Sequence, residues 1–303
     1  AAGYACIVDV SEPEERAKLF GYAGAALGLG FIFGPAIGGL LGEYWVRLPF
    51  IVAGGLIFLV FLVGYFIFPE TLKEENRRGF SLARANPLGS LMSIARYPAV
   101  LMILAALFLV QLGNHSYTSI WSFYVTAVAG WGPFLIGLSV SVYGFGLAGV
   151  QGGLTGPVVS RFGEVRAIFF AMIVGLISFS ILAVAQNGAH IYIAIAIGVF
   201  GGFMGPAMQS LMTERIPADS QGELQGAITS LYSLASIISP AVMAFIFTAQ
   251  TDETGLYLPG APFLLATALG VLAMLIFAIG AKRIGDRVAP ADDAEVAVAD
   301  PVD

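Results

Sequence analysis

Eight stretches of the sequence are each apolar over about 20 residues, the length of helix that crosses roughly 30 Å of hydrocarbon. Because lipid offers the backbone no hydrogen-bond partners, we expect each stretch to form an α-helix. Hydrophobic residues make up 58% of the chain and charged residues only 11%, which excludes an ordinary soluble domain. The sequence therefore predicts an all-α integral membrane protein. The expected spans are 19–42, 48–68, 99–126, 134–157, 166–186, 190–213, 224–248 and 262–281.

Basic residues gather on one side of the predicted membrane. When the connections between spans are assigned alternately to the two sides, all but one of the 14 lysines and arginines fall together, and only Arg47 falls opposite. The positive-inside rule makes the basic side cytoplasmic. We therefore expect a multi-pass protein of a bacterial-type cytoplasmic (inner) membrane, with its C-terminus in the cytoplasm.

The predicted helices fall into two groups. Residues 69–97, rich in charged and turn-forming residues, are the expected cytoplasmic linker between two bundles. Residues 1–68 are expected to be the remainder of an N-terminal bundle, namely the end of its fourth helix and its fifth and sixth helices. Residues 98–283 are expected to form a C-terminal six-helix bundle, and the acidic residues 284–303 a disordered tail.

An internal repeat supports this division. Shifting the chain by 205 residues aligns acids, glycines and prolines of the first group with those of the second. The repeat predicts duplication, with twelve helices in the intact protein. The first three helices and most of the fourth would then precede this sequence. The aligned pairs are Asp9 with Glu214, Leu19 with Leu224, Gly21 with Gly226 and Pro35 with Pro240.

Three segments resemble a known family. DVSEPEERAKLFGYAGAALGLGFIFGPAIGG (9–39) resembles the fifth-helix region of major facilitator superfamily drug/proton antiporters, including their G-x-x-x-G-P-x-x-G-G pattern. Residues 131–167 and 201–240 are similar to tetracycline efflux proteins. The resemblance implies the major facilitator fold, with two pseudo-symmetric helical bundles of which the N-terminal one is truncated here. It also implies proton-coupled export of amphipathic drugs. The residues of the pattern are Gly30, Gly34, Pro35, Gly38 and Gly39.

Glycine spacing predicts a close helix contact in this region. Gly30, Gly34, Gly38 and Gly42 recur every four residues, which leaves one helix face nearly bare and lets another backbone approach. Pro35 lacks an N–H and can bend the helix at that contact. By resemblance, the contact seals the interface between bundles that opens and closes, and Pro240 keeps the proline in the second half.

A short basic loop is the second candidate conformational element. Its residues Gly156, Ser160, Arg161, Gly163 and Arg166 resemble the second-half copy of the superfamily's cytoplasmic loop motif. An arginine there can bond to helix carbonyl ends and to a nearby acid, and we expect Arg161 to pair with Glu214. The resemblance implies Asp9 and Arg16 as partners of the first-half copy. Alternatively, these cations only follow the positive-inside rule.

Polar side chains inside the spans predict a wet cavity, because burial without a partner is costly. Gln111, Asn114 and His115 occupy a single helical turn, more polarity than packing requires. Amides and aromatics without fixed charge suit a large, amphipathic, weakly charged substrate. Interhelical hydrogen bonding is the alternative for the lone hydroxyls, and Trp121 and Tyr232 could instead be interface aromatics. The predicted substrate-binding residues are Gln111, Asn114, His115, Trp121, Tyr143, Gln151, Gln209 and Tyr232.

The coupling proton has no carboxylate partner within the predicted spans. Tetracycline efflux proteins carry an acid in their ninth helix, but residues 167–186 have none, so we expect the coupling acids in the upstream helices. His115 is the imidazole placed within a span. One cysteine and two distant histidines exclude a metal cluster, and no catalytic constellation is visible. We expect no enzyme activity, no cofactor beyond the proton, no nucleic-acid partner and a lipid-embedded monomer. An uptake permease for a small organic solute and a non-transporting receptor are the alternatives.

Overall fold

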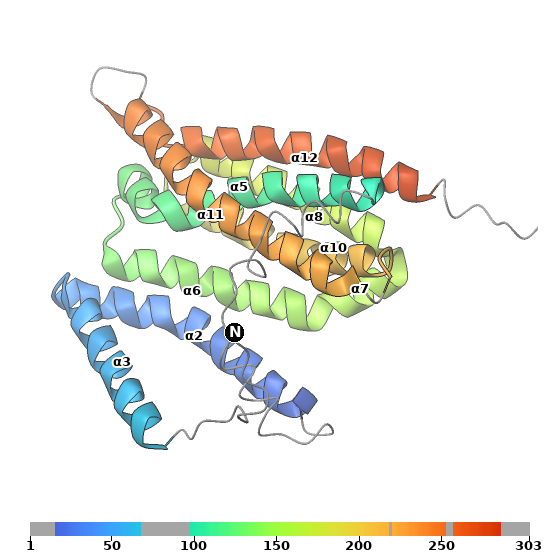
Figure 1. The fold of residues 1–303 in the computed structure, drawn as a ribbon. Coiled ribbons are helices and arrows are strands. Elements are labelled where there is room, and N and C mark those ends of the chain that lie inside the picture. Colours follow the sequence, from blue (N-terminus) through green and yellow to red (C-terminus); the bar gives the residue numbers. More distant parts are fainter. Residues whose placement is uncertain (1–15, 68–96, 218–219, 253–256, 286–303) are drawn as a thin grey trace, which may run out of the picture.

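The structure, a computed structural model, describes residues 16–67, 97–217, 220–252 and 257–285, and these residues form long helices joined by short turns (Figure 1). All eight predicted spans are helical, with ends that differ by a few residues. Seven helical runs are long and apolar enough to cross a membrane. The run at 19–42 is helical but is not among these seven. No strand occurs in the described ranges.

The described elements lie before and after residues 68–96 of the chain. In order they are α2 (Arg16–Tyr44), α3 (Leu48–Ile67), α5 (Pro98–Ala129), α6 (Pro133–Gly149), the π-helix η3 (Val150–Leu154), α7 (Thr155–Phe162), α8 (Glu164–Val184), α9 (Gly188–Gly198), the 3-10 helix η4 (Val199–Phe203), α10 (Met204–Thr213), α11 (Gln221–Thr251) and α12 (Ala261–Gly285).

Two of the membrane-length runs are interrupted by non-α turns. The sequence VQGGL forms η3 between α6 and α7, and VFGGF forms η4 between α9 and α10. Each holds a glycine pair, which weakens regular α-helix and tolerates a change of helical pitch. Such turns often occur at functional positions. Both lie beside the cavity described below, and neither was predicted.

The helices α5 to α12 pack into one bundle around α5. Helix α5 lies against α12 and α11, and α8 lies against α12 and α9. Apolar side chains such as Ile103, Met208 and Phe277 fill one half of the core. Tyr124, Leu182 and Phe263 lie in the other half. Two buried hydroxyl groups bond to neighbouring helices: the Tyr124 hydroxyl donates to the Leu182 carbonyl, and Ser239 Oγ donates to Leu112 O at 2.7 Å. The buried Ser141 Oγ has no partner among the described residues.

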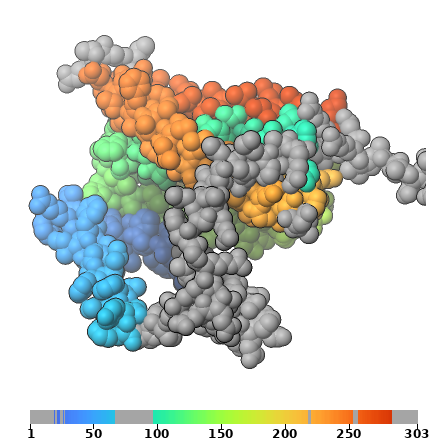
Figure 2. Space-filling view, in the orientation of Figure 1, coloured from blue at the N-terminus to red at the C-terminus, as the bar shows by residue number. Residues whose placement is uncertain are grey.

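Helices α2 and α3 precede that bundle in the chain and differ in how they contact it. Figure 2 shows them in blue, at one side of the body formed by the later helices. Helix α2 lies along α6, whereas α3 leaves the end of α2 and is exposed along its length. The predicted division into 1–68, a linker at 69–97, a bundle at 98–283 and a tail at 284–303 stays a prediction. Residues 1–15, 68–96 and 286–303 lie outside the described residues.

Candidate functional site

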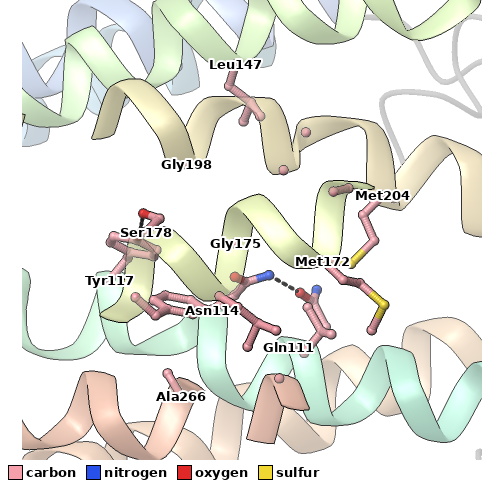
Figure 3. A pocket seen from close by; sticks show the side chains of 18 of the residues that line it. Gln111, Asn114, Tyr117, Leu147, Met172, Gly175, Ser178, Gly198, Met204 and Ala266 are labelled. Carbon is pink, nitrogen blue, oxygen red and sulfur yellow. Dashed lines mark hydrogen bonds between the residues drawn. The ribbon is translucent and has the colours of Figure 1, made fainter. Parts of the chain in front are cut away.

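A cavity of about 360 Å³ lies within the bundle formed by α5 to α12. One wall comes from a single face of α5, and the opposite wall is almost bare because it is built from glycines. Figure 3 shows α8 and the α9–η4–α10 run across the cavity from α5. The α5 wall consists of Leu107, Val110, Gln111, Asn114 and Tyr117; the bare wall consists of Gly198, Gly201, Gly202 and Gly205.

The most polar part of the cavity is an amide pair on α5. Asn114 Nδ2 donates to Gln111 Oε1 at 3.1 Å, one helical turn apart (Figure 3). This bond leaves the Nε2 of Gln111 and the Oδ1 of Asn114 without a hydrogen bond to any described residue. Each amide has both donor and acceptor capacity. The pair can therefore offer a ligand one donor and one acceptor at neighbouring points.

Aromatic rings form the other end of the cavity. The ring of Tyr117 stacks on that of Tyr143, with centroids 5.7 Å apart and planes at 23°. The Tyr117 hydroxyl lies 3.4 Å from Ser178 Oγ, which donates to the Ala194 carbonyl at 2.8 Å. This network fixes the Tyr117 hydroxyl, and both tyrosine rings line the cavity. Stacking against aromatic rings favours flat, apolar ligand parts.

No charged side chain lines the cavity among the described residues. Gln151, at η3, donates through Nε2 to the Gly202 carbonyl at 3.4 Å and so joins the two non-α turns across the cavity. Met172 and Met204 add flexible apolar surface that adapts to different shapes. The site is therefore uncharged, partly aromatic and adaptable.

Five of the eight predicted substrate-binding residues line the cavity, and three do not. The five are Gln111, Asn114, Tyr143, Gln151 and Tyr232.

The other three predicted residues bond elsewhere. His115 lies about 40° around α5 from Gln111 and about 100° from Asn114, outside the cavity lining, and its Nδ1 is 3.3 Å from Thr118 Oγ1. Trp121 lies about 10 Å beyond Asn114 along the helix axis, where it is buried and donates to Ser139 Oγ at 3.0 Å. Gln209 Nε2 donates to Gln225 Oε1 at 3.3 Å, outside the cavity.

Several lining residues were missed by sequence reasoning. Tyr117 lies one turn beyond Asn114 on the same face, and Ser178 faces it from α8. The four glycines of the bare wall also follow a pattern in the sequence, because their positions have the i, i+3, i+4 and i+7 spacing of one helix face. That spacing could have identified the wall.

The second candidate element is the contact between α2 and α6, which brings two backbones together. A Cβ on Gly137 would lie 2.1 Å from Pro35 O and 3.1 Å from Gly39 Cα. A Cβ on Gly39 would lie 2.5 Å from Pro133 O. Both glycines are therefore required for the helices to approach this closely. Gly42 also belongs to the contact, since its Cβ would meet Pro133 Cβ at 3.3 Å.

The predicted contact face of α2 needs correction. No heavy atom of the described residues lies within 4 Å of a Cβ placed on Gly30, Gly34 or Gly38, so these glycines do not carry the contact with α6. The contacting face instead runs through Pro35, Gly39 and Gly42, spaced by four and three residues. The four-residue spacing found a bare face correctly but could not tell which face meets α6.

Carbonyl groups and a carboxylate of α2 complete this interface. Because Pro35 has no N–H, the Phe31 carbonyl lacks its helical donor, and it lies beside Gly144 of α6. At the far end, Glu43 Oε2 accepts from the Phe134 N–H at 3.3 Å, at the N-terminus of α6. A helix N-terminus favours negative charge, so Glu43 strengthens this end of the contact. Sequence analysis did not select Glu43.

The α2–α6 contact runs from Gly42 and Pro133 to Phe31 and Gly144. Their ribbons lie side by side near the start of α6 and diverge toward α7 (Figure 1). Consistently, Gly28 of α2 and Gly149, Gly152 and Gly153 of the other run have open space around them. Within the described residues, the two helices are therefore in contact from the Pro133 end as far as Gly144 and separate beyond it.

The basic loop between α7 and α8 is a single residue. Gly163 has φ +79°, a conformation that favours glycine, and it lets α8 begin directly after α7. The predicted pair of Arg161 and Glu214 is not formed within the described residues. The Arg161 guanidinium lies 5.7 Å from the centroid of the Phe162 ring. The inter-helix bond instead involves Glu164, which accepts from Ser210 Oγ at 3.1 Å.

The remaining predicted conformational residues are less informative. Gly156 has open space around it, and Pro240 lies within α11. Arg16 begins α2, but its side chain is outside the described set, as is the whole of Asp9. Arg166, near the start of α8, borders an apolar groove considered below.

A multi-pass helical bundle around an uncharged polar cavity has the architecture of a membrane transporter. The sequence profile of the Major Facilitator Superfamily matches residues 1–240. The class C tetracycline resistance protein of Escherichia coli is 33% identical over 252 residues, which cover 83% of this chain and 63% of that protein. The chain belongs to the Major Facilitator Superfamily.

Other relatives agree with this assignment. The class G tetracycline resistance protein of Vibrio anguillarum is 32% identical over 249 residues, 82% of this chain and 63% of that protein. The quinolone resistance protein NorA of Staphylococcus aureus is 27% identical over 278 residues, 90% and 67% of the two chains. The human organic anion transporter MFSD10 shares the fold, with a TM-score of 0.60, 20% identity and coverage of 90% of this chain and 66% of that one. The chain spans 63% of the length of the first two relatives.

Proposed function

We propose that this protein takes part in proton-coupled efflux of amphipathic drugs, of the tetracycline or multidrug type, across a bacterial cytoplasmic membrane. The observation that carries the proposal is the cavity, which combines an exposed amide donor and acceptor with stacked tyrosine rings and no charge. The relatives named for resistance to tetracyclines and quinolones favour export over uptake.

The size and chemistry of the cavity fit this substrate class. A volume of about 360 Å³ falls at the lower end of the roughly 300 to 1,000 Å³ typical of small-molecule sites. One end offers hydrogen bonds through Gln111 and Asn114, and the other offers ring faces through Tyr117 and Tyr143. A sugar would require a denser set of polar groups, and an anion would require arginines. A flat, weakly charged amphipathic molecule satisfies both ends.

Alternating access follows from the α2–α6 interface. In this account, the closed end at Gly39 and Gly137 separates when the bundles rock, and the open end near Gly149 closes. Helices whose backbones touch at glycines pack tightly, and such packing does not loosen gradually. The interface therefore has two states, one in contact and one separated. The unequal contact along the two helices supports one of the two states that this mechanism needs.

Proton coupling is assigned to carboxylates outside the cavity wall. No acid lines the cavity among the described residues, so the titrating group belongs to another part of the transporter. We propose that the proton is the coupling ion and that no other cofactor takes part. We propose that the C-terminus lies in the cytoplasm, on the side predicted to hold nearly all the basic residues.

The direction of transport tests the proposal. The complete gene is expressed, and uptake of tetracycline and of a lipophilic dye is followed in everted membrane vesicles with an acidified interior. The account expects accumulation inside the vesicles that collapses when the pH gradient is dissipated. Proton-driven uptake into right-side-out vesicles would instead identify a permease, and binding without transport in either orientation would identify a receptor.

A further inference from the structure

A second hollow lies on the outside of the bundle, where α7, α8 and η4 meet. It has a volume of about 400 Å³ and a lining that is apolar except for one arginine. Its floor is fully buried, formed by Ala167 and Phe203. Its rim is formed by large side chains that remain 39 to 51% exposed. The rim residues are Leu154, Phe162, Phe170 and Phe200.

This groove is separate from the central cavity. The two hollows share no lining residue, although both use α8 and η4. The groove uses the side of α8 that carries Arg166 and Phe170, whereas the cavity uses Met172 and Gly175. A ligand of the groove therefore need not enter the substrate path.

Two cations stand at one end of the groove. Arg166 lines it directly, and Arg161 lies over the ring of Phe162, a rim residue. The acid between them in sequence, Glu164, accepts from Ser210 on α10, and neither arginine forms an ion pair with a described residue. The turn at Gly163 thus presents positive charge, which no acid of the described residues pairs, beside an apolar surface.

We propose that the groove binds an anionic glycerophospholipid, with an acyl chain on its phenylalanines and the phosphate on Arg166 and Arg161. The apolar part runs from Phe162 to Leu154, eight residues or about 12 Å along the helix. That length covers most of one leaflet's share of a hydrocarbon core of roughly 30 Å. The arginines then lie at the depth of the headgroups.

The location favours an anionic headgroup over a zwitterionic one. The arginines lie on the side predicted to be cytoplasmic, where anionic lipids create a negative surface potential. Basic pockets between membrane helices on that side are suited to anionic headgroups. Two arginines that pair with no described acid complement a phosphate diester that carries a net negative charge, whereas a choline group would add a repelling cation.

Native mass spectrometry of the purified 303-residue chain tests the proposal. The chain is titrated with phosphatidylglycerol and with phosphatidylcholine of the same acyl length. We expect one phosphatidylglycerol to bind in preference. Arg166→Gln should weaken that binding about fivefold, the loss expected for one basic residue near an anionic surface, and should leave phosphatidylcholine unchanged. Arg166→Lys, which keeps the charge, should retain most of the binding.

Controls separate the groove from general surface charge. Arg215→Gln removes an exposed arginine outside the groove, near the end of α10, and should have no effect. Phe170→Ala shortens a rim side chain, and Leu154→Trp fills the end of the groove farthest from the arginines. Both variants should weaken lipid binding and keep the melting temperature unchanged. Equal losses with Arg215→Gln and Arg166→Gln, no preference for phosphatidylglycerol, or full competition by glycerol 3-phosphate would each overturn the proposal.

Discussion

The contact between α2 and α6 allows a sharp test at Gly137. In Gly137→Ala the added Cβ would stand 2.1 Å from Pro35 O and 3.0 Å from Pro35 C, both backbone atoms that no side-chain rotation can move. A favourable C···O separation is about 3.3 Å or more, so α2 must retreat by about 1 Å. Overpacking of this kind costs about 1 to 3 kcal/mol. That cost shifts the balance toward separated helices by about 5- to 150-fold.

Spin labels on the two helices measure this shift. With Cys6 replaced by serine, labels at Leu40 of α2 and Leu135 of α6, both exposed, give the distance distribution across the contact by double electron–electron resonance. We expect Gly137→Ala to move the distribution to longer distances and to lower the melting temperature.

A matched variant controls for the glycine substitution itself. Gly149→Ala lies in the same helical run but has open space around its Cβ position. It should leave the distances unchanged and add about 0.5 to 1 kcal/mol of helix stability. If the two variants behave alike, the close contact does not hold the helices together, and our account of the interface is refuted.

Three further changes test other parts of the structure. Gln111→Ala should weaken drug binding about 2- to 13-fold in a fluorescence titration, because the ligand loses the donor that Gln111 Nε2 offers, whereas Gln209→Ala, outside the cavity, should bind normally. Tyr124→Phe should lower the free energy of unfolding by about 1 to 2 kcal/mol, because the Leu182 carbonyl loses its buried donor; an unchanged thermal midpoint would contradict this. Glu43→Gln should favour separation of α2 and α6 about two- to fivefold at low salt, with the difference vanishing at high salt; a salt-independent effect would exclude the helix-dipole explanation.

The helices could be predicted because the hydropathy of a segment depends on its own residues and not on how the segment packs. The eight apolar runs all form helices. The two non-α turns were not predicted, since Gly152, Gly153, Gly201 and Gly202 are compatible with an uninterrupted membrane helix as well as with a change of pitch. Only packing against a neighbouring helix decides between these conformations.

The lining of the cavity was predicted in part, because polarity within a span does not depend on how the helices pack. Polarity inside a span selected Gln111 and Asn114, which do line the cavity. The same criterion selected His115, which bonds to Thr118 on its own helix, and Gln209, which bonds to Gln225 on the next. Polarity shows that a side chain needs a partner but does not say whether that partner is a ligand or another residue.

Glycine positions show the same limit. A repeat of small residues predicted a close contact for the helix from 19 to 42, and a close contact exists. Its location at Gly39 and Gly42, rather than at Gly30 and Gly34, depends on where Gly137 of α6 meets the helix. One helix alone cannot specify that position.

Photolabelling of the drug site tests the central claim most directly. A photoactivatable analogue of a transported drug is bound to the protein, cross-linked and mapped by peptide sequencing. The account predicts labels on the cavity face of α5 around Gln111 and Tyr117, and on Tyr143 and Tyr232, with loss of labelling when unmodified drug competes. Competable labels confined to other surfaces, such as the groove at Phe170, would show that the cavity is not where the drug binds.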